Sequence, residues 1–308
     1  MHPALQRFLP HLALLTAMAF WGSTFAALRV ALTALSPLET MAGRMSVACA
    51  VFLPLWPRIW RELCSGGRWG ALLLMGLCEP CLYFLFETHA LRLTTASQAG
   101  MITSLLPLLV AAAAFVFLRE QAGARMWAGF ALAVTGVVWL TLAAESGEKA
   151  VNPLLGNALE GLAMCCAAGY TVLARHLSGV YGAMTITAVQ SAVGMVFFCL
   201  SALLAPQPGA ALSLGREFPA WLPWACVVYL GGVVTFAGYG LYNFGVKRLS
   251  AGGAAAYVNL IPVFALLCGA VFLDERLLPA QYGGAALILA GVLLSQWRGA
   301  ARPARVRN

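Results

Sequence analysis

One ionisable residue lies deep inside an apolar stretch of the chain. Glu79 falls within the run 69–91 and is followed directly by Pro80. A helix that begins at Trp69 carries this carboxyl about 15 Å along its axis, at 1.5 Å per residue. A carboxyl at the centre of a bilayer is costly and is by default a functional hypothesis. We interpret Glu79 as a residue that binds a cationic group or carries a proton; the alternative is a protonated, hydrogen-bonded core carboxyl.

Other polar and aromatic side chains fall inside apolar runs, where a substrate could be held. Tyr83 is one turn after Glu79, on the same helix face. Arg44 lies about two turns into the second run, and it could meet a substrate carboxylate or pair with Glu39 or Glu79. The other candidate substrate-binding residues are Trp21, Thr103, Tyr170, Tyr239, Tyr257 and Asn259. The aromatic residues could stack on an apolar substrate, and packing is the competing interpretation for each.

Three prolines fall inside predicted helices, at Pro80, Pro107 and Pro262. Proline removes one backbone hydrogen bond from a helix, and in a membrane the freed carbonyl needs a polar partner nearby. Thr103 and Asn259 precede Pro107 and Pro262 by one turn. We predict that these prolines act as hinges, with a static kink as the alternative.

The chain offers little for other chemistries. Cys78 and Cys81 form a single C-x-x-C pair, and soft thiolates bind copper or zinc; His89 lies too far along the same run to join them. The sequence contains no H-E-x-x-H, no G-x-S-x-G and no Walker motif. We therefore predict no catalytic residue, no metal and no cofactor, and the chain is not expected to be an enzyme.

The composition requires lipid as the solvent. The chain has 308 residues, of which 61% are hydrophobic and only 10% charged, with a mean hydropathy of +0.84. Soluble domains carry about 25% charged residues. Most of the nine cysteines lie in apolar runs, where buried free thiols are expected. The net charge of +8 sits in short loops and the tail, which is typical of membrane orientation and not of nucleic-acid binding.

About ten runs are long enough to cross a bilayer, which takes roughly 20 apolar residues in a helix. The predicted spans are 11–33, 38–57, 69–91, 95–118, 123–143, 155–177, 183–205, 220–243, 252–273 and 279–297. The first is too long for the apolar core of a signal peptide and is expected to remain in the protein. We predict an all-α integral membrane protein.

The fourth and fifth spans recur as the ninth and tenth, under a shift of about 155 positions. The aligned pairs are Pro107 and Pro262, Phe117-Leu118 and Phe272-Leu273, Glu120 and Glu275, Gly129 and Gly284, and Gly136 and Gly291. Chance matching of Ala and Leu does not explain a proline, a glutamate and two glycines in register. The predicted organisation is a first repeat at 10–143, an extracytoplasmic linker at 144–154, a second repeat at 155–297 and a basic cytoplasmic tail at 298–308.

Five spans is an odd number, so the second repeat must enter the membrane from the opposite face. Segments predicted inside hold about 13 of the 19 Lys and Arg residues and those predicted outside about four, which places both termini in the cytoplasm. Inverted repeats of this kind are typical of secondary transporters, which expose a site near the midplane to either side. The sequence therefore predicts a carrier that works by alternating access.

Several features have structural interpretations. The repeated glycines are expected to allow close helix packing. Arg29 lies near a helix end and is expected to extend to the membrane interface. The expected loop ion pairs are Glu120 with Arg119 or Arg125, and Glu275 with Arg276.

The chain also resembles the drug/metabolite transporter superfamily, specifically its EamA-type permeases. The matching pieces are FWGSTFAALRV at 20–30, SPLETMAGR at 36–44, the run 90–120, CCAAGYTVLARHL at 165–177 and the run 246–275. The resemblance implies ten helices in two inverted five-helix repeats, an inner-membrane location and export of small metabolites such as amino acids.

Together these observations predict a multi-pass inner-membrane carrier that exports a small metabolite, with protons as the candidate coupling ion. The expected partners are a small-molecule substrate and the lipid bilayer, with no nucleic acid; no oligomeric state is predicted. The alternatives are a membrane-embedded enzyme and a non-transporting scaffold that use the same central region.

Overall fold

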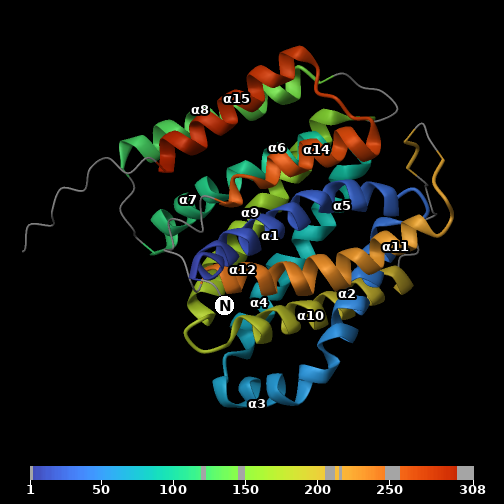
Figure 1. Cartoon of the computed structure of the whole chain (residues 1–308), viewed down its shortest axis with the longest axis vertical. Coiled ribbons are helices and arrows are strands. Elements are labelled where there is room, and N and C mark those ends of the chain that lie inside the picture. Colours follow the sequence, from blue (N-terminus) through green and yellow to red (C-terminus); the bar gives the residue numbers. More distant parts are fainter. Residues whose placement is uncertain are drawn as a thin grey trace, which may run out of the picture.

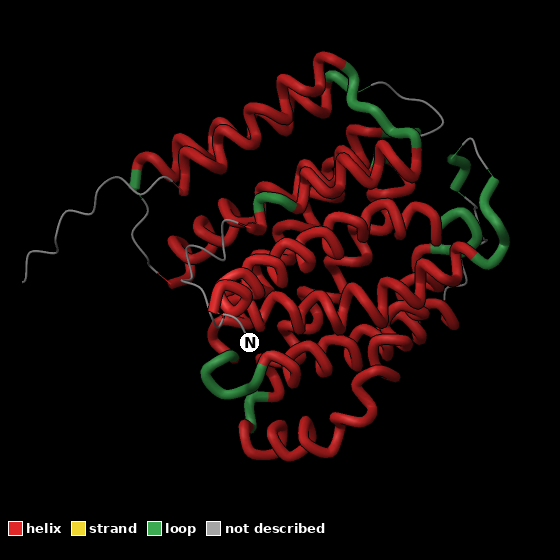
Figure 2. The backbone as a smooth tube through the Cα atoms, viewed as in Figure 1, coloured by secondary structure: helices red, strands yellow, loops and turns green. Residues whose placement is uncertain are grey.

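The computed structural model describes residues 3–118, 123–144, 150–204, 212–214, 217–246 and 257–296, and it is a bundle of helices (Figure 1; Figure 2). Eight helical stretches in these residues are long and apolar enough to cross a membrane. They are 8–31, 37–66, 69–93, 96–113, 124–142, 153–177, 183–204 and 222–242. Two shorter apolar helices, Ile261–Leu273 and Pro279–Ser295, complete the set. The prediction of an all-α membrane protein with about ten spans is confirmed.

The first five spans contain eight helices. They are α1 (Pro3–Ala31), α2 (Pro37–Phe52) continuing into α3 (Trp56–Gly66), α4 (Trp69–Gly76) and α5 (Tyr83–Leu93), α6 (Ala96–Ile102) and α7 (Leu106–Leu118), and α8 (Ala124–Leu142). Ser36 begins α2 with a capping box, in which its hydroxyl accepts from Glu39 N–H and the Glu39 carboxylate accepts from Ser36 N–H.

The next five spans repeat this plan. They are α9 (Pro153–Leu177), α10 (Ala183–Leu204), α11 (Leu222–Val228) and α12 (Tyr239–Val246), α14 (Ile261–Leu273) and α15 (Pro279–Gln296). The third and eighth spans are both interrupted by wider, π-type turns, at Leu77–Leu82 and Tyr229–Gly238. Such turns are rare and occur often at functional sites.

The internal repeat is visible in the packing of α8 against α15, which lie side by side (Figure 1). A Cβ on Gly129 would lie 2.5 Å from the Gly291 carbonyl oxygen, and one on Gly136 would lie 2.7 Å from the Gly284 carbonyl oxygen. Residue numbers therefore rise on one helix and fall on the other, so equivalent helices of the two repeats are antiparallel. A two-fold axis that relates antiparallel spans lies in the membrane plane, and the repeats are inverted. The expected role of these glycines in close packing is confirmed.

The predicted position of one proline within its helix is wrong. Pro262 lies in the first turn of α14, after a turn at 259–260, and not in the middle of a helix. Proline at this position costs no internal hydrogen bond. Pro107 is the second residue of α7, and the Thr103 carbonyl that it cannot bond accepts instead from Leu106 N–H in a tighter turn. A hinge role for either proline stays a prediction.

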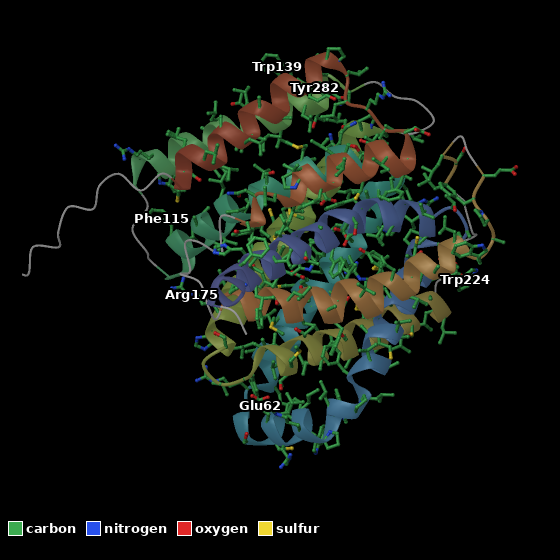
Figure 3. The ribbon with its side chains drawn as sticks, in the orientation of Figure 1. Glu62, Phe115, Trp139, Arg175, Trp224 and Tyr282 are labelled. Atoms are coloured by element: carbon green, nitrogen blue, oxygen red, sulfur yellow. The ribbon has the colours of Figure 1, made fainter. Side chains whose placement is uncertain are left out.

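The outer surface of the bundle is apolar, as lipid contact requires. Exposed leucines and valines are distributed over α4, α8, α9, α10 and α14. Trp139, Trp224 and Tyr282 are exposed near the ends of α8, α11 and α15 (Figure 3). Trp and Tyr gather where membrane meets water. These positions mark the membrane face that also carries the connections 32–36, 94–95 and 274–278, which we call the linker face.

Candidate functional site

Glu79 interrupts the third span, between α4 and α5. Its backbone is extended (φ −144°, ψ 118°) inside an otherwise helical segment, and Pro80 cannot donate to the helix. The Glu79 carbonyl leaves the helical ladder and accepts from Gln190 Nε2 at 3.1 Å. Its carboxylate Oε1 accepts from the Tyr239 hydroxyl at 3.3 Å. One residue thus joins the third, seventh and eighth spans, and so joins the two repeats.

Aromatic rings surround this carboxyl. The Trp21 indole packs on Tyr239 at 5.3 Å and on Tyr242 at 5.1 Å between ring centroids. Tyr170 is close enough to Glu79, Gln190 and Tyr242 to interact electrostatically with them. These six residues form what we call the central cluster: Trp21, Glu79, Tyr170, Gln190, Tyr239 and Tyr242. Trp21, Glu79, Tyr170 and Tyr239, predicted separately from the sequence, are thus brought together.

Arg44 lies beside this cluster and is buried. Its guanidinium carbon is 4.1 Å from the centre of the Phe84 ring, a cation–π arrangement. Pairing with Glu39 is excluded because that carboxylate caps α2. The strongest electrostatic attraction on Arg44 comes from Glu87 and a weaker one from Glu79. Among the described residues, nothing accepts a hydrogen bond from Arg44 Nε or Nη1.

Two buried carboxyls that interact with Tyr83 were not identified from the sequence. Glu87 Oε1 accepts from the Tyr83 hydroxyl at 2.6 Å, while Glu87 Oε2 has no partner among the described residues. Glu160 is fully buried, neither of its oxygens has a described partner, and its electrostatic neighbour is Glu87. These residues form the carboxyl cluster: Arg44, Tyr83, Glu87 and Glu160. Both glutamates lie inside predicted spans, so the argument that selected Glu79 applies equally to them.

Helix geometry places the carboxyl cluster at one depth. Arg44, Glu87 and Glu160 are each about 10 Å from the linker-face ends of α2, α5 and α9, at 1.5 Å per residue. The start of α9 does meet the end of α5, because Asn152 N–H donates to the Leu93 carbonyl at 3.0 Å. The central cluster lies deeper, and Tyr83 stands between the two.

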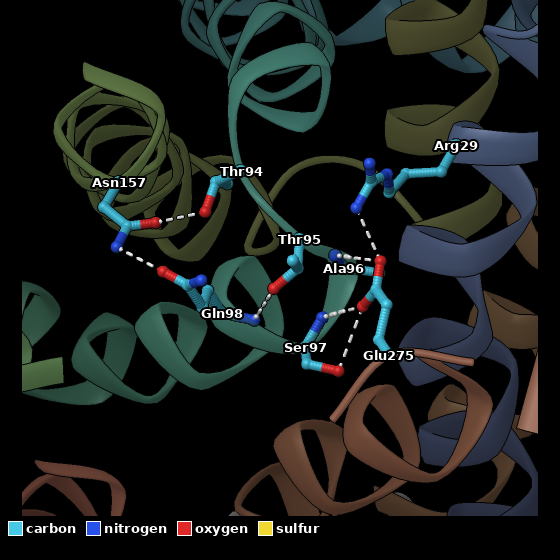
Figure 4. Close-up of polar contacts among 8 residues, drawn as sticks. All are labelled: Arg29, Thr94, Thr95, Ala96, Ser97, Gln98, Asn157 and Glu275. Carbon is cyan, nitrogen blue, oxygen red and sulfur yellow. Dashed lines mark hydrogen bonds and ion pairs between the residues drawn. The ribbon is translucent and has the colours of Figure 1, made fainter. Parts of the chain in front are cut away.

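The linker face is closed by a buried ion pair (Figure 4). Arg29 Nη1 donates to Glu275 Oε1 at 2.5 Å, and both side chains are shielded from solvent. Glu275 also accepts from Ala96 N–H at 3.1 Å and from the N–H and hydroxyl of Ser97 at 3.0 and 3.1 Å. These are first-turn amides of α6, which have no acceptor within their own helix.

Two sequence expectations are therefore wrong. Arg29 does not extend to the interface, because a carboxylate is available inside the bundle. Glu275 does not pair with Arg276 in a loop, because it is buried against α1 and α6. Glu120, its counterpart in the first repeat, lies outside the described residues, as does Arg119.

A neutral hydrogen-bond network lies beside the ion pair. Asn157 Oδ1 accepts from the Thr94 hydroxyl at 2.7 Å, and its amide donates to Gln98 and Thr141 at 2.9 Å each. Figure 4 shows Asn157 and Glu275 approaching the start of α6 from opposite sides. The network joins the third to sixth spans at this face.

Three predicted site residues lie elsewhere. The Thr103 hydroxyl donates to the Gly100 carbonyl of its own helix at 2.7 Å. The Tyr257 hydroxyl bonds His11 Nδ1 at 2.8 Å, near the opposite membrane face. Asn259 lies in the turn before α14. Cys78 and Cys81 are free thiols, and the described part of the chain holds no group of three or more His, Cys, Asp or Glu suited to a metal ion.

Comparison with known proteins decides the family. The model of the EamA-like transporter family matches residues 9–142 and again residues 154–297. The chain belongs to the EamA-like transporter family. Its two matches cover nearly the whole chain, in agreement with the two copies in the fold. The chain is a multi-pass membrane protein of a transporter family, as the resemblance in its motifs indicated.

Relatives of this EamA-like protein carry transporter names. An "Uncharacterized transporter YetK" of Bacillus subtilis is 28% identical over 73% of this chain and 67% of its own length. A "Probable amino-acid metabolite efflux pump" of Escherichia coli is 27% identical over 94% of this chain and 97% of its own length. A solved structure at 23% identity covers 92% of this chain and 95% of its own, with a TM-score of 0.57, and it shows the shared fold.

Proposed function

We propose that this EamA-like transporter is a secondary carrier that exports a small metabolite by alternating access, with the central cluster as its binding site. The observation that carries the proposal is the contact between Glu79 and Tyr239, which places a buried carboxyl between the two repeats. Inverted repeats commonly hold the substrate near the membrane midplane, at their interface. Helix rocking about that interface would expose the cluster to each side in turn.

The chemistry of the two clusters favours an amphipathic substrate with both charges, such as an amino acid. Arg44 Nε and Nη1 have no acceptor among the described residues, and such donors suit a carboxylate. Glu79 offers an anionic partner for an ammonium group, and the Trp21 and Tyr239 rings offer an apolar surface. The name of the Escherichia coli relative, a probable amino-acid metabolite efflux pump, is in line with this class.

Orientation and location belong to the same proposal. We place both termini in the cytoplasm and the linker face outside, in the inner or plasma membrane, as the Lys and Arg distribution indicates. The repeat units are then 10–143 and 155–297, with 144–154 as the extracytoplasmic linker and 298–308 as a cytoplasmic tail. Glu79 is the proposed proton carrier for coupling.

Transport in liposomes tests this function. A thermal-shift screen of the purified protein against amino acids, nucleosides and cations first selects a ligand. Counterflow and pH-driven efflux of that ligand are then compared for the wild type, Glu79→Gln and Glu217→Gln, in which the altered carboxyl is exposed. We expect Glu79→Gln to lose pH-driven transport and Glu217→Gln to keep it. Wild-type exchange and wild-type pH response in Glu79→Gln would exclude a coupling role.

The hinge proposal has its own measurement. Pro107→Ala and Pro262→Ala should each bias the face from which single cysteines near the central cluster can be labelled, because each proline starts a helix at an equivalent place in its repeat. Labelling from both faces at wild-type rates in both variants would exclude the hinges.

A further inference from the structure

Among the described spans, the buried carboxyl groups outnumber the buried cations. Arg29 and Glu275 form a buried ion pair. Arg44 is the single buried cation that interacts with the remaining carboxyls, Glu79, Glu87 and Glu160, directly or through Glu87. If all three carboxyls were ionised, two negative charges would stay uncompensated in a low-dielectric region, at a cost of several kcal/mol for each ion. Positive charge from outside the described side chains must therefore occupy this region.

Buried carboxylate oxygens without a described partner indicate where one positive charge can bind. Tyr83 occupies one oxygen of Glu87, and the other oxygen is buried with no described partner. Both carboxylate oxygens of Glu160 are also buried without a described partner. Glu160 interacts electrostatically with Glu87. Arg44 supplies an independent indication, because it is a buried cation beside Glu87 whose Nε and Nη1 are also without described acceptors.

We propose that Glu87 and Glu160 form a second proton-binding site, separate from Glu79, which holds one proton between two carboxyl groups. Two neighbouring buried carboxylates cannot both ionise, because each disfavours the charge of the other. A proton on Glu160 turns an acceptor-only group into an O–H donor. Glu87 Oε2 is the acceptor available to receive that hydrogen bond, while Tyr83 holds Oε1 in place.

A proton fits this site better than a metal ion. The hard cations Ca²⁺ and Mg²⁺ need about six or more oxygen ligands, and the pair offers three unpartnered oxygens. The described residues also hold no group of three or more candidate metal ligands. Oxidation or another co-reactant plays no part, since one O–H bond forms when the proton enters and breaks when it leaves.

The surroundings of the pair contain few competing charges. The segments α4, α6 and α7, which pack on α9, contain no titratable side chain in their sequences, and α8 contributes Arg125 only at its far end. The elements packed around the pair carry further titratable and charged residues. They are Glu39, Arg44 and Cys49 on α2, Tyr83, His89 and Arg92 on α5, Cys78, Glu79 and Cys81 at 77–82, Cys165, Cys166, Tyr170, Arg175 and His176 on α9, and Arg7, His11 and Arg29 on α1, of which Arg29 is bound to Glu275. Arg44 and Tyr83 are the groups that interact with Glu87, and Tyr83 and Glu79 are affected by Glu87 in turn.

Tyr83 gives the pair a connection to the central cluster. Glu79, Tyr83 and Glu87 follow one another at intervals of four residues, and Tyr83 interacts electrostatically with both carboxyls. On the linker-face side, Asn157 precedes Glu160 by one turn and belongs to the hydrogen-bonded network at the start of α6. The pair therefore stands between the linker face and Glu79. A role for its proton in coupling rests on the proposed transport function, but the presence of the proton does not.

Infrared difference spectroscopy tests the site without any substrate. The full-length protein in detergent is titrated with acid and base, and the C=O stretch of protonated carboxyl groups is recorded. We expect a band that persists at neutral pH, shifts in D2O, disappears in Glu160→Gln and is displaced in Glu87→Gln, where the protonated Glu160 loses its hydrogen-bond acceptor. The same band should persist in Glu79→Gln and in the exposed control Glu217→Gln. Tyr83→Phe should displace it, because Glu87 then loses the hydroxyl that orients it.

Each other outcome overturns the proposal. A wild-type protein with no such band at neutral pH has no resident proton, and a band that is unchanged in both glutamine variants belongs to other residues. A band that is lost when NaCl replaces choline chloride assigns the site to Na⁺ instead. Glu160→Asp retains a carboxyl, so a folded Glu160→Asp protein with a displaced band distinguishes loss of the proton from loss of the fold. Liposome transport plays no part in this result, so the site and the transport function can fail separately.

Discussion

Removal of Glu275 should destabilise the protein more than removal of its partner Arg29. The Glu275 carboxylate accepts four hydrogen bonds, from Arg29, from two backbone amides and from the Ser97 hydroxyl. In Glu275→Gln, one oxygen becomes an NH2 donor that faces other donors, and the buried guanidinium of Arg29 loses the carboxylate of its ion pair. Loss of one partner from a buried ion pair costs about 3–5 kcal/mol. We expect a loss in the free energy of unfolding at that level.

Arg29→Met should cost less, although it also removes one side of the pair. The carboxylate then keeps three donors, and hydrogen bonds to a charged group contribute about 1.5–3 kcal/mol each. Attraction to the positive start of α6 adds a further contribution of about 0.3–1 kcal/mol. We expect Arg29→Met to cost about 1–2 kcal/mol less than Glu275→Gln, since the remaining carboxylate keeps three donors, whereas in Glu275→Gln the buried guanidinium loses its carboxylate.

The assay is a double-mutant cycle on unfolding in mixed micelles of mild detergent and SDS, followed by circular dichroism. The double variant Arg29→Met/Glu275→Gln should be more stable than additivity predicts, by about 2 kcal/mol, because it removes both charges of the pair together. A coupling energy below about 0.5 kcal/mol is the additivity expected of independent sites. That result would refute the assignment of Arg29 and Glu275 as one buried pair.

Three further predictions address the fold and the central cluster. Gly284→Ala should lower the thermal midpoint of the purified protein, because its Cβ would lie 2.6 Å from Leu140 N. The control Gly283→Ala should leave the midpoint unchanged, because the nearest atom to its Cβ is 3.4 Å away, on Trp139. Equal midpoints for the two variants would contradict the packing of α8 on α15. Tyr239→Phe removes one hydrogen bond to Glu79, worth about 1 kcal/mol, and should slow pH-driven efflux about fivefold; an unchanged rate would detach Tyr239 from coupling. Reporter tags placed after the fifth span and at the C-terminus should report opposite compartments, and one compartment for both would exclude an odd number of spans in the second repeat.

The fold was predictable because its signals are long and repeated. Apolar runs of about 20 residues identify spans without knowledge of their partners, and an odd number of spans in each copy requires inversion. The glycines that recur seven residues apart indicate a close helix contact, and they do make one. The break at Glu79 was also indicated locally, by a proline next to a carboxyl. Each of these inferences uses either residues close together in sequence or the comparison of one repeat with the other.

The site was predictable only in part, because distance along a helix gives depth but not direction. Glu79 and Tyr239 lie at suitable depths and do meet. Tyr257 satisfied the same criterion and instead contacts His11. Arg29 and Glu275 are 246 positions apart, and nothing local to either residue identifies the other. Glu87 and Glu160 differ from these cases because, like Glu79, they are ionisable residues inside apolar spans. Every ionisable residue inside a span is a candidate for function, and this criterion applied to all three glutamates would have identified them.

The ion pair at the linker face also constrains how the carrier can move. In the proposed cycle this face must open, and α6 must then separate from α1 or from the connection that carries Glu275. If the pair breaks in the open state, its coupling energy of about 2 kcal/mol favours the closed state by a factor of about 30, at 1.4 kcal/mol for each tenfold. Substrate or proton binding must offset this bias through stronger interaction with the open state. The carboxyl cluster lies about 10 Å below the linker face, where proton binding could offset this bias. A change of charge on Glu87 and Glu160 acts on α5 and α9, and both of these helices border the start of α6. Glu275→Gln should then increase cysteine labelling from the linker face, whereas a pair that stays intact throughout the cycle would lower stability without changing that labelling.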